Sequence, residues 1–243
     1  DTEVKLRYNI HIEIVNLIKE PMKNILSIDL DYISDVYLGN SFKGYLGTSL
    51  VSEKYWDVAV EACRPNASDL VENRKNVREV FRAFLDSRAG NTKVVFGIHH
   101  DSIRNHIPKE AEDLNIVNID HHHDLGYSRV QDIQSSLGVN NEANWVSAIS
   151  DQISDYTWVK NSSSFTEGHT PPLGFNIYEK ESANDVDIKG TKWDLVFVCL
   201  SPNYTYDTHW IYFYLLIDVY ESQTGNKVVI DHSRSSEQDF SKI

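Results

Sequence analysis

Short runs of apolar residues, separated by longer polar stretches, are the main pattern along this chain. Four runs are rich in aliphatic and aromatic residues and predict buried β-strands at 24–31, 93–97, 115–120 and 194–200. A further segment, 4–14, alternates apolar with polar residues and predicts a strand or a hairpin. Side chains that can bind ions stand at the ends of three of these predicted strands.

Between the strands, apolar residues recur at the spacing of an amphipathic helix. Helices are predicted over 51–63, 68–88, 138–158 and 210–220. In the second of these, Ser68 is placed to cap the helix and the Arg88-Ala-Gly90 sequence to end it. Residues 160–172 are rich in Ser, Thr and Pro and predict a loop. Strands that alternate with helices predict a single α/β domain over residues 1–243 with a mostly parallel central sheet.

The chain is strongly acidic, with 36 Asp and Glu against 23 Lys and Arg and a formal net charge of −13. This balance disfavours nucleic acid as a partner and favours a cationic one, although negative charge also serves solubility alone. No apolar run is long enough to span a membrane and the charged start does not resemble a signal peptide, so a cytoplasmic protein is expected. Oligomeric state is not indicated.

The two cysteines, Cys63 and Cys199, lie far apart and predict neither a disulfide framework nor a thiolate zinc site. Histidine and aspartate are grouped instead. In a parallel sheet, ligands bind beyond the carboxyl ends of the strands. The groups at predicted strand ends are Asp29 with Asp31, His99 with His100 and Asp101, and the run from Asp120 to Asp124, which includes His121, His122 and His123.

Side chains alternate across an extended strand, so Asp29 and Asp31 are expected on one side, and Asp120, His122 and Asp124 on one side. Converging carboxylates repel one another unless a cation lies among them. Many carboxylates, about two imidazoles and no thiolate favour Mn²⁺ or a similar ion, and the donors suffice for two ions. Taken alone, a D-x-D sequence is more often a cap or a solvated turn, and a His-rich tract can bind metal adventitiously.

These residues resemble the metal motifs of the ureohydrolase superfamily of arginases, agmatinases and related deacetylases. Asp120, His122 and Asp124 match its D-A-H-x-D motif, and Asp29 and Asp31, preceded by Ser27, match S-x-D-x-D. The turn after residue 97 approximates the GGDHS motif, with His99 favoured over His100 as the ligand. The S-x-D-x-D motif comes first here and late in an arginase, which implies an arginase-like three-layer α/β fold with circularly permuted motif order.

The segments 27–32, 118–125, 141–145 and 200–203 resemble a divergent arginase-like branch that includes the peptide arginases of ribosomal peptide (RiPP) biosynthesis. This resemblance implies a post-translational modification in which arginine side chains of a precursor peptide become ornithine and urea is released. It implies two Mn²⁺ ions per chain. The metal ligands expected from it are Asp29, Asp31, His99, Asp120, His122 and Asp124.

The residue that receives the guanidinium has no clear counterpart, because alignment with the arginase pattern puts Cys199 in its place. Glu142 and Asp207 are the acidic candidates, and His121, His123 and His209 are candidates for the proton shuttle. Of these, His121, His123 and Glu142 are the favoured catalytic residues. Two alternatives stay open: a zinc amidohydrolase of the deacetylase type with one metal, and a noncatalytic peptide-binding module with a structural metal.

Overall fold

The computed structural model describes residues 21–33, 67–88, 90–126, 144–161, 164, 174–202, 205 and 207–234. For residues 67–72 and 207–208 it describes the backbone alone. The strand or hairpin predicted at 4–14, the helix predicted at 51–63 and most of the loop predicted at 160–172 lie outside this part of the chain.

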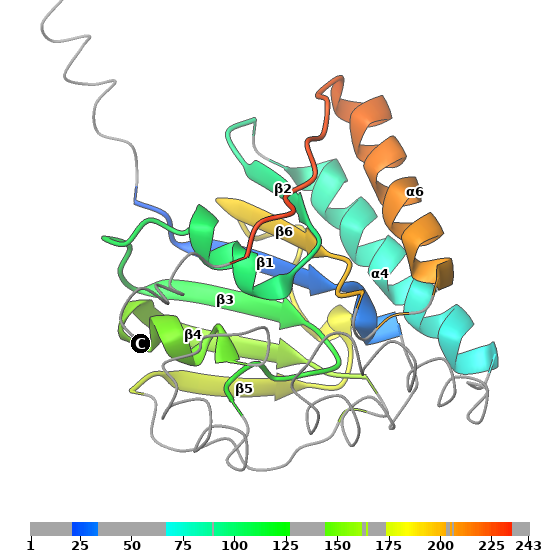
Figure 1. The fold of residues 1–243 in the computed structure, drawn as a ribbon. Coiled ribbons are helices and arrows are strands. Elements are labelled where there is room, and N and C mark those ends of the chain that lie inside the picture. Colours follow the sequence, from blue (N-terminus) through cyan, green and yellow to red (C-terminus); the bar gives the residue numbers. More distant parts are fainter. Residues whose placement is uncertain are drawn as a thin grey trace, which may run out of the picture.

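A six-stranded parallel sheet forms the centre of the molecule, with the strand order β2-β6-β1-β3-β4-β5 (Figure 1). Each pair of neighbouring strands is parallel. The strands are β1 (Asn24–Asp29), β2 (Lys93–Gly97), β3 (Leu114–Ile119), β4 (Ile153–Val159), β5 (Asn176–Lys180) and β6 (Leu195–Cys199). The predicted α/β class with a mostly parallel sheet is therefore confirmed.

Strand β1 lies inside the sheet, between β6 and β3. The register places Asp29 beside Cys199 of β6, and Ile28 beside Ile119 of β3. Since all three strands run in the same direction, their carboxyl ends meet at one edge, where Asp29 and Asp120 become neighbours. A site at this edge therefore draws on residues that are far apart in the sequence.

Two long helices, α4 (Ala67–Ser87) and α6 (Asp207–Thr224), lie next to each other on one face of the sheet (Figure 1). The hydroxyl of Tyr212 in α6 donates to the carbonyl of Arg74 in α4 at 2.9 Å. Apolar side chains of both helices pack on alternate residues of the strands. The main members of this core are Val77, Phe81 and Phe84 of α4, Phe213, Leu216 and Ile217 of α6, and Leu26, Ile28, Phe96, Val196 and Val198 of the sheet.

The opposite face carries a second apolar cluster and short 3-10 helices. These are η2 (His100–His106) and η4 (Ser147–Gln152), while η1 (Leu30–Ile33) follows β1 and η5 (Ala183–Asp185) follows β5. Strand residues Ile25, Ile116 and Phe197 pack here against Ile103 and Trp145. The sheet is thus covered on both faces, as expected for a parallel sheet with strongly apolar strands.

Four predicted strands and two predicted helices are confirmed, with shifts of a few residues at their ends, although the first strand stops at Asp29 rather than at residue 31. The helix predicted over 138–158 is wrong within the described residues: 144–152 form 3-10 turns and 153–159 form β4. Ile153, Tyr156 and Trp158 are β-branched or aromatic and fill the core from a strand as well as they would from a helix. Strand β5 was not predicted.

None of the described helices is both long enough and apolar enough to cross a bilayer.

Candidate metal centre

The carboxylates at the sheet edge follow from strand alternation. Ser27 and Asp29 share one face of β1, and Asn118 and Asp120 share the same face at the end of β3. All four are almost completely buried, with no residue exposed by more than 2%. Polar residues thus replace apolar ones only at the last positions of this face, where the sheet meets the loops.

Asp31 reaches the same place by a different route from the one the sequence predicted. Strand β1 ends at Asp29 and the chain turns into η1, so Asp31 is not on an extended strand. Its backbone N–H donates to Oδ1 of Asp29 at 3.1 Å, which closes a tight turn at the strand end. The expected convergence of Asp29 and Asp31 is therefore found, but it results from this turn rather than from strand alternation.

The segment 120–124 is likewise folded back rather than extended. Strand β3 ends at Ile119, and the backbone N–H of His122 donates to Oδ1 of Asp120 at 2.7 Å. Asp124 has a left-handed backbone with φ of 50°, which is uncommon for a residue with a side chain. The prediction that Asp120, His122 and Asp124 converge through an extended strand is therefore wrong in its geometry, although all three lie in this region.

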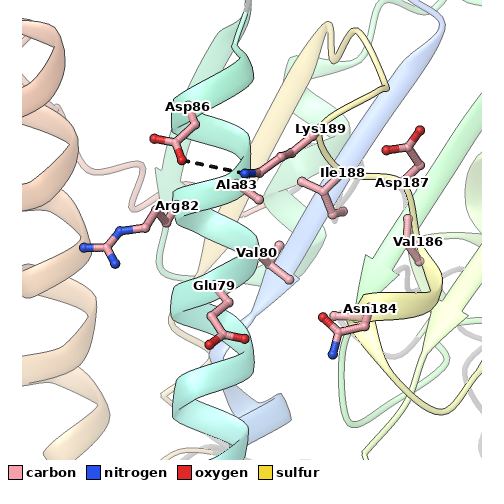
Figure 2. Close-up of a pocket in the computed structure, with 11 residues that line it drawn as sticks. Glu79, Val80, Arg82, Ala83, Asp86, Asn184, Val186, Asp187, Ile188 and Lys189 are labelled. Atoms are coloured by element: carbon pink, nitrogen blue, oxygen red, sulfur yellow. Dashed lines mark ion pairs between the residues drawn. The ribbon is translucent and has the colours of Figure 1, made fainter.

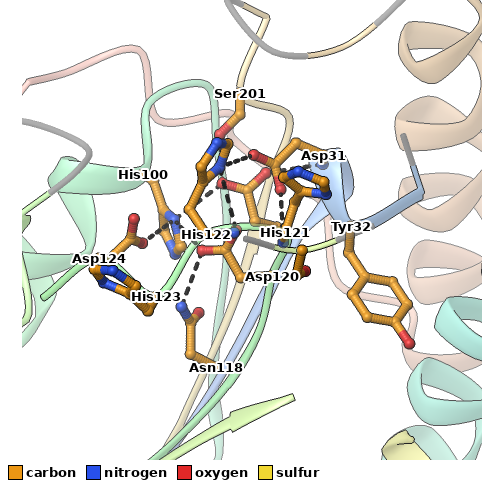
Figure 3. A network of polar contacts seen from close by, with 12 residues as sticks. Asp31, Tyr32, His100, Asn118, Asp120, His121, His122, His123, Asp124 and Ser201 are labelled. Atoms are coloured by element: carbon orange, nitrogen blue, oxygen red, sulfur yellow. Dashed lines mark hydrogen bonds and ion pairs between the residues drawn. The ribbon is translucent and has the colours of Figure 1, made fainter. Parts of the chain in front are cut away.

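Asp29, His100 and Asp120 form a group that could hold a metal ion, and we define the first ligand group as these residues together with Asp124, which contacts His100. Figure 3 shows how His100, Asp120 and Asp124 lie. Nδ1 of His100 lies 2.9 Å from Oδ2 of Asp29, 3.3 Å from Oδ2 of Asp120 and 3.0 Å from Oδ2 of Asp124. Three carboxylate oxygens therefore surround one imidazole nitrogen at a buried position. Nε2 of the same ring is 2.7 Å from the hydroxyl of Ser27, which fixes the orientation of the ring.

The second ligand group consists of Asp31, Asp120 and His122 (Figure 3). Nδ1 of His122 lies 2.7 Å from Oδ2 of Asp31 and 3.8 Å from Oδ1 of Asp120. Asp120 is thus common to both groups, with Oδ2 directed to His100 and Oδ1 to His122. Buried Asp and His groups at this edge are suited to hold a metal ion.

His100, rather than His99, is the histidine that the structure brings to this cluster. His100 is 1% exposed and begins η2, whereas His99 precedes that helix as its N-cap residue and is half-buried. The sequence favoured His99 because it stands nearer the strand end. The chain instead continues extended through His99, with φ of −114° and ψ of 131°, so the next residue turns toward the carboxylates.

The electrostatics of the cluster fit a cation. Burial raises the pKa of Asp29, and raises the pKa values of Asp31 and Asp124 well above the ordinary value for a carboxyl. Neighbouring carboxylates add to the effect, since Asp29 and Asp120 act on Asp31, and Asp120 acts on Asp124. Four buried carboxylates therefore cannot all be ionised at low cost unless positive charge lies between them.

His100 supplies positive charge in the metal-free arrangement. Burial opposes its protonation, yet the charges of Asp29 and Asp124 raise its pKa well above the ordinary value. Burial also opposes the charged form of Asp120, but hydrogen bonding to His100 and the charge of that ring hold the pKa of Asp120 below its ordinary range. The protonated imidazole of His100 thus provides the positive charge that a metal ion would otherwise provide in the first ligand group.

Two of the three favoured catalytic residues lie among the described residues. Burial, and then the charge of His122, lowers the pKa of His121 to about 3, so this ring is neutral beside the second ligand group. His123 is 1% exposed, its Nδ1 accepts from the backbone N–H of Leu125 at 3.0 Å, and its ring packs edge-on against Trp158. These contacts make His123 part of the turn, while Glu142 lies outside the described residues.

Several buried polar residues at the edge had no role assigned from the sequence. The Asn118 side chain donates to Oδ2 of Asp120 at 2.9 Å, and the hydroxyl of Ser201 donates to Oδ2 of Asp29 at 2.5 Å. Ser201 has φ of 47° and follows β6 closely, so a strained backbone places this hydroxyl. A polar residue close to the carboxyl end of an otherwise apolar strand was the available signal.

A surface pocket lies elsewhere, between α4 and the segment around η5 (Figure 2). Its lining mixes charges, and Lys189 lies 4.0 Å from Asp86 across it. None of its lining residues belongs to the two ligand groups. Among the residues that the structure describes, the groups that could hold a metal ion therefore lie at the sheet edge and not in this pocket.

Comparison with known proteins gives no family for this chain: no family model, no curated protein and no solved structure matches it.

Proposed function

We propose that this protein is a two-metal hydrolase that converts arginine side chains of a peptide to ornithine and releases urea. The observation that carries the proposal is the shared position of Asp120 between the ligand groups of His100 and His122. A carboxylate between two sets of donors is the arrangement used for a pair of ions that act together. The match of Asp29, Asp31, Asp120, His122 and Asp124 to ureohydrolase motifs supports the choice of substrate.

The donors fit two Mn²⁺ ions. The first ligand group would hold one ion with three carboxylates and one imidazole, and the second would hold the other with two carboxylates and one imidazole. Oxygen donors with a few imidazoles and no thiolate suit Mn²⁺ better than structural zinc. When bound, the ions lower the pKa of water and supply a hydroxide nucleophile at neutral pH.

The chain's own residues orient and neutralise the site. Ser201 donates to Oδ2 of Asp29 and Asn118 donates to Oδ2 of Asp120, and both of these oxygens face Nδ1 of His100. The reaction adds water to the guanidinium carbon and breaks the bond from this carbon to Nε, and the departing nitrogen takes up a proton to leave as an amine. An acidic protein with a net charge of −13 favours a cationic peptide over an anionic one.

The proposal extends to the fold. The S-x-D-x-D motif spans the end of β1, the first described strand, and D-x-H-x-D follows β3, and this motif order supports the proposal of a permuted arginase-like chain. Both motifs end strands that are neighbours in the sheet, which lets a changed order along the chain give the same spatial site.

The deciding experiment measures urea and peptide mass together. Protein loaded with Mn²⁺ is incubated with an arginine-containing peptide, with free arginine and with agmatine, and each converted residue should lose about 42 Da, as hydrolysis of a guanidino group to an amine requires. Asp120→Asn removes the shared carboxylate charge and should abolish conversion. Asp113→Asn changes an exposed aspartate at the other end of β3 and should leave conversion unchanged.

The outcomes separate the proposal from its alternatives. One zinc per chain and hydrolysis of an acetylated amine, without urea, would identify a deacetylase-like enzyme. Tight peptide binding without turnover in the presence of saturating Mn²⁺ would identify a binding module. Conversion of free arginine but not of the peptide would retain the reaction and overturn the peptide substrate.

A further inference from the structure

Asp124 occupies an unusual place among the carboxylates of the first ligand group. Asp29 ends a strand and Asp120 follows one directly, so the sheet itself fixes their backbones. Asp124 comes after a turn, and its backbone is left-handed. A different part of the molecule must therefore hold this carboxylate in place.

Three hydrogen bonds from residues 145–147 hold this turn. Nε1 of Trp145 donates to Oδ2 of Asp124 at 2.6 Å, and the backbone N–H of Val146 donates to the carbonyl of Asp124 at 3.3 Å. The hydroxyl of Ser147 donates to the carbonyl of Leu125. Both the side chain and the backbone of Asp124 are thus fixed from one short segment ahead of β4.

Trp145 is completely buried, and its ring centre lies 5.3 Å from that of His100. The same indole therefore contacts two members of the first ligand group, one through a hydrogen bond and one through its ring. The oxygen that accepts from Trp145 is also the oxygen that faces Nδ1 of His100. One lone pair of Oδ2 is occupied by the indole, which leaves the other directed into the ligand group.

We propose that Trp145 is a positioning residue for the metal ion of the first ligand group. This inference rests on the proposed two-metal function. The indole N–H orients Asp124 toward His100 without taking part in the reaction. The indole contacts Asp124 and His100, neither of which belongs to the second ligand group, so an ion held by Asp31, Asp120 and His122 should not depend on these contacts.

The test is a Mn²⁺ titration of the metal-free full chain and of Trp145→Phe, which keeps an aromatic ring and loses the N–H. Loss of an outer hydrogen bond to a metal ligand weakens metal affinity by about 10–100-fold. We expect this loss for one of two ions, with the affinity for the other unchanged. Trp193→Phe is the matched control, since Trp193 is buried in the other core and donates from Nε1 to the carbonyl of Ile188.

A second pair of variants separates positioning from general damage. Asp124→Asn should weaken the same ion, and Trp145→Phe added to it should cause little further loss, because both changes remove one interaction. Ser147→Ala removes only the Leu125 contact and should lower the affinity for the same ion to a smaller extent. This variant tests the inference if Trp145→Phe fails to fold. An equal loss of affinity for both ions would overturn the inference. No loss of affinity in variants that fold would overturn it as well.

Metal binding needs no turnover, so the two proposals fail in different ways. Two-ion binding that depends on Trp145, without urea from any substrate, would retain this inference and reject the ureohydrolase. Urea release with unchanged Mn²⁺ affinity in Trp145→Phe would retain the enzyme and reject the positioning role.

Discussion

Nδ1 of His100 lies 2.9 Å from Oδ2 of Asp29, although His100 comes after β2 and Asp29 ends β1, two strands that are separated in the sheet by β6. The contact is buried, and Oδ2 of Asp120 and Oδ2 of Asp124 lie close to the same nitrogen. A single imidazole thus contacts every carboxylate of the first ligand group. Substitutions at these residues should change metal binding in ways that can be tested separately.

Changes at Asp120 and Asp31 should differ in the number of ions lost. Asp120 belongs to both ligand groups, so Asp120→Ala should abolish high-affinity binding of both ions. Asp31 belongs only to the second group, so Asp31→Asn should weaken one ion and leave about one per chain. Elemental analysis of dialysed protein measures both stoichiometries. Equal stoichiometry in the two variants would contradict a shared carboxylate.

Substitutions of the adjacent histidines His99 and His100 should change the Mn²⁺ affinity to different extents. His100→Gln should lower Mn²⁺ affinity by about 10–100-fold or more, since it removes a ring nitrogen from the middle of three carboxylates. His99→Gln is the neighbouring control and should retain affinity. Calorimetric titration of the metal-free chains checks this, and an effect confined to His99→Gln would restore the choice made from sequence.

Metal loading should stabilise the chain more as the pH rises. Burial, with the charges of Asp29 and Asp120, raises the pKa of Asp31, and burial likewise raises that of Asp124. A carboxyl with a higher pKa in the folded than in the unfolded state contributes stability below its unfolded pKa, and this stability is lost as the pH rises through the folded pKa. The free energy of unfolding of the metal-free chain should therefore fall as the pH rises toward neutral. Deprotonated ligands bind the ion best in this range.

The measurement is the melting temperature with and without saturating Mn²⁺ at several pH values between about 5 and 8. The difference between the two melting temperatures should widen with pH. A constant or narrowing difference would contradict the assignment of these buried carboxyls to metal binding.

Gly97 ends β2 against an aromatic ring. A Cβ built on Gly97 would collide with the ring of Phe197, which packs in the buried core of the neighbouring strand. Gly97→Ala should therefore lower the free energy of unfolding by about 1–3 kcal/mol, as overpacking of a core does. Gly90→Ala is the control, because a Cβ there meets no atom within 4 Å. Urea denaturation of the two variants compares them directly, and equal stabilities would show that Phe197 yields freely.

The segment after α6 is attached to the sheet edge through Asp231. Its backbone N–H donates to the carbonyl of Phe96 at 2.8 Å, and its Oδ2 lies 2.7 Å from Nε2 of His106. Burial acts to raise the pKa of Asp231, but hydrogen bonds from Ser233 and His106 hold it below the ordinary value. A lowered carboxyl pKa contributes stability above the unfolded pKa, which is lost as the pH falls through the folded pKa.

Asp231→Asn should therefore cost about 1 kcal/mol of unfolding free energy at neutral pH, the usual size of one hydrogen bond. The difference from the unmodified chain should disappear in strong acid. Asp218→Asn, on the exposed side of α6, provides the control. A cost that persists unchanged in acid would show that the charge of Asp231 is not involved.

The sequence predicted the strands best where burial is complete. Residues 195–199 are buried at every position and predict a strand without reference to any partner. Strand β5 was missed because its residues are largely exposed and no apolar pattern distinguishes them. The spacing of Trp145, Val146, Ile149 and Ile153 mimicked one helix, whereas it arises from a 3-10 segment followed by a strand.

The site was predictable in composition and less so in geometry. The aspartates of β1 and of the 120–124 segment were identified from their spacing, and the structure brings them together. The choice between His99 and His100 depends on where the chain turns after β2, which sequence spacing does not fix. The contact of Trp145 with Asp124 joins distant segments, so no local pattern contains it.

The position of β1 between β3 and β6 has a consequence for synthesis. Ile25 pairs with Leu195, so the central strand leaves the ribosome about 170 residues before its last neighbour. At a synthesis rate of roughly 5–20 residues per second, the edge of β1 that pairs with β6 stays unpaired for on the order of ten seconds. Asp29 at the end of β1 and Asp120 after β3 are both synthesised before β6, but His100 and Asp29 cannot take their final positions until β6 is inserted between β2 and β1. Completion of the sheet and assembly of the candidate metal centre should therefore occur as one late event.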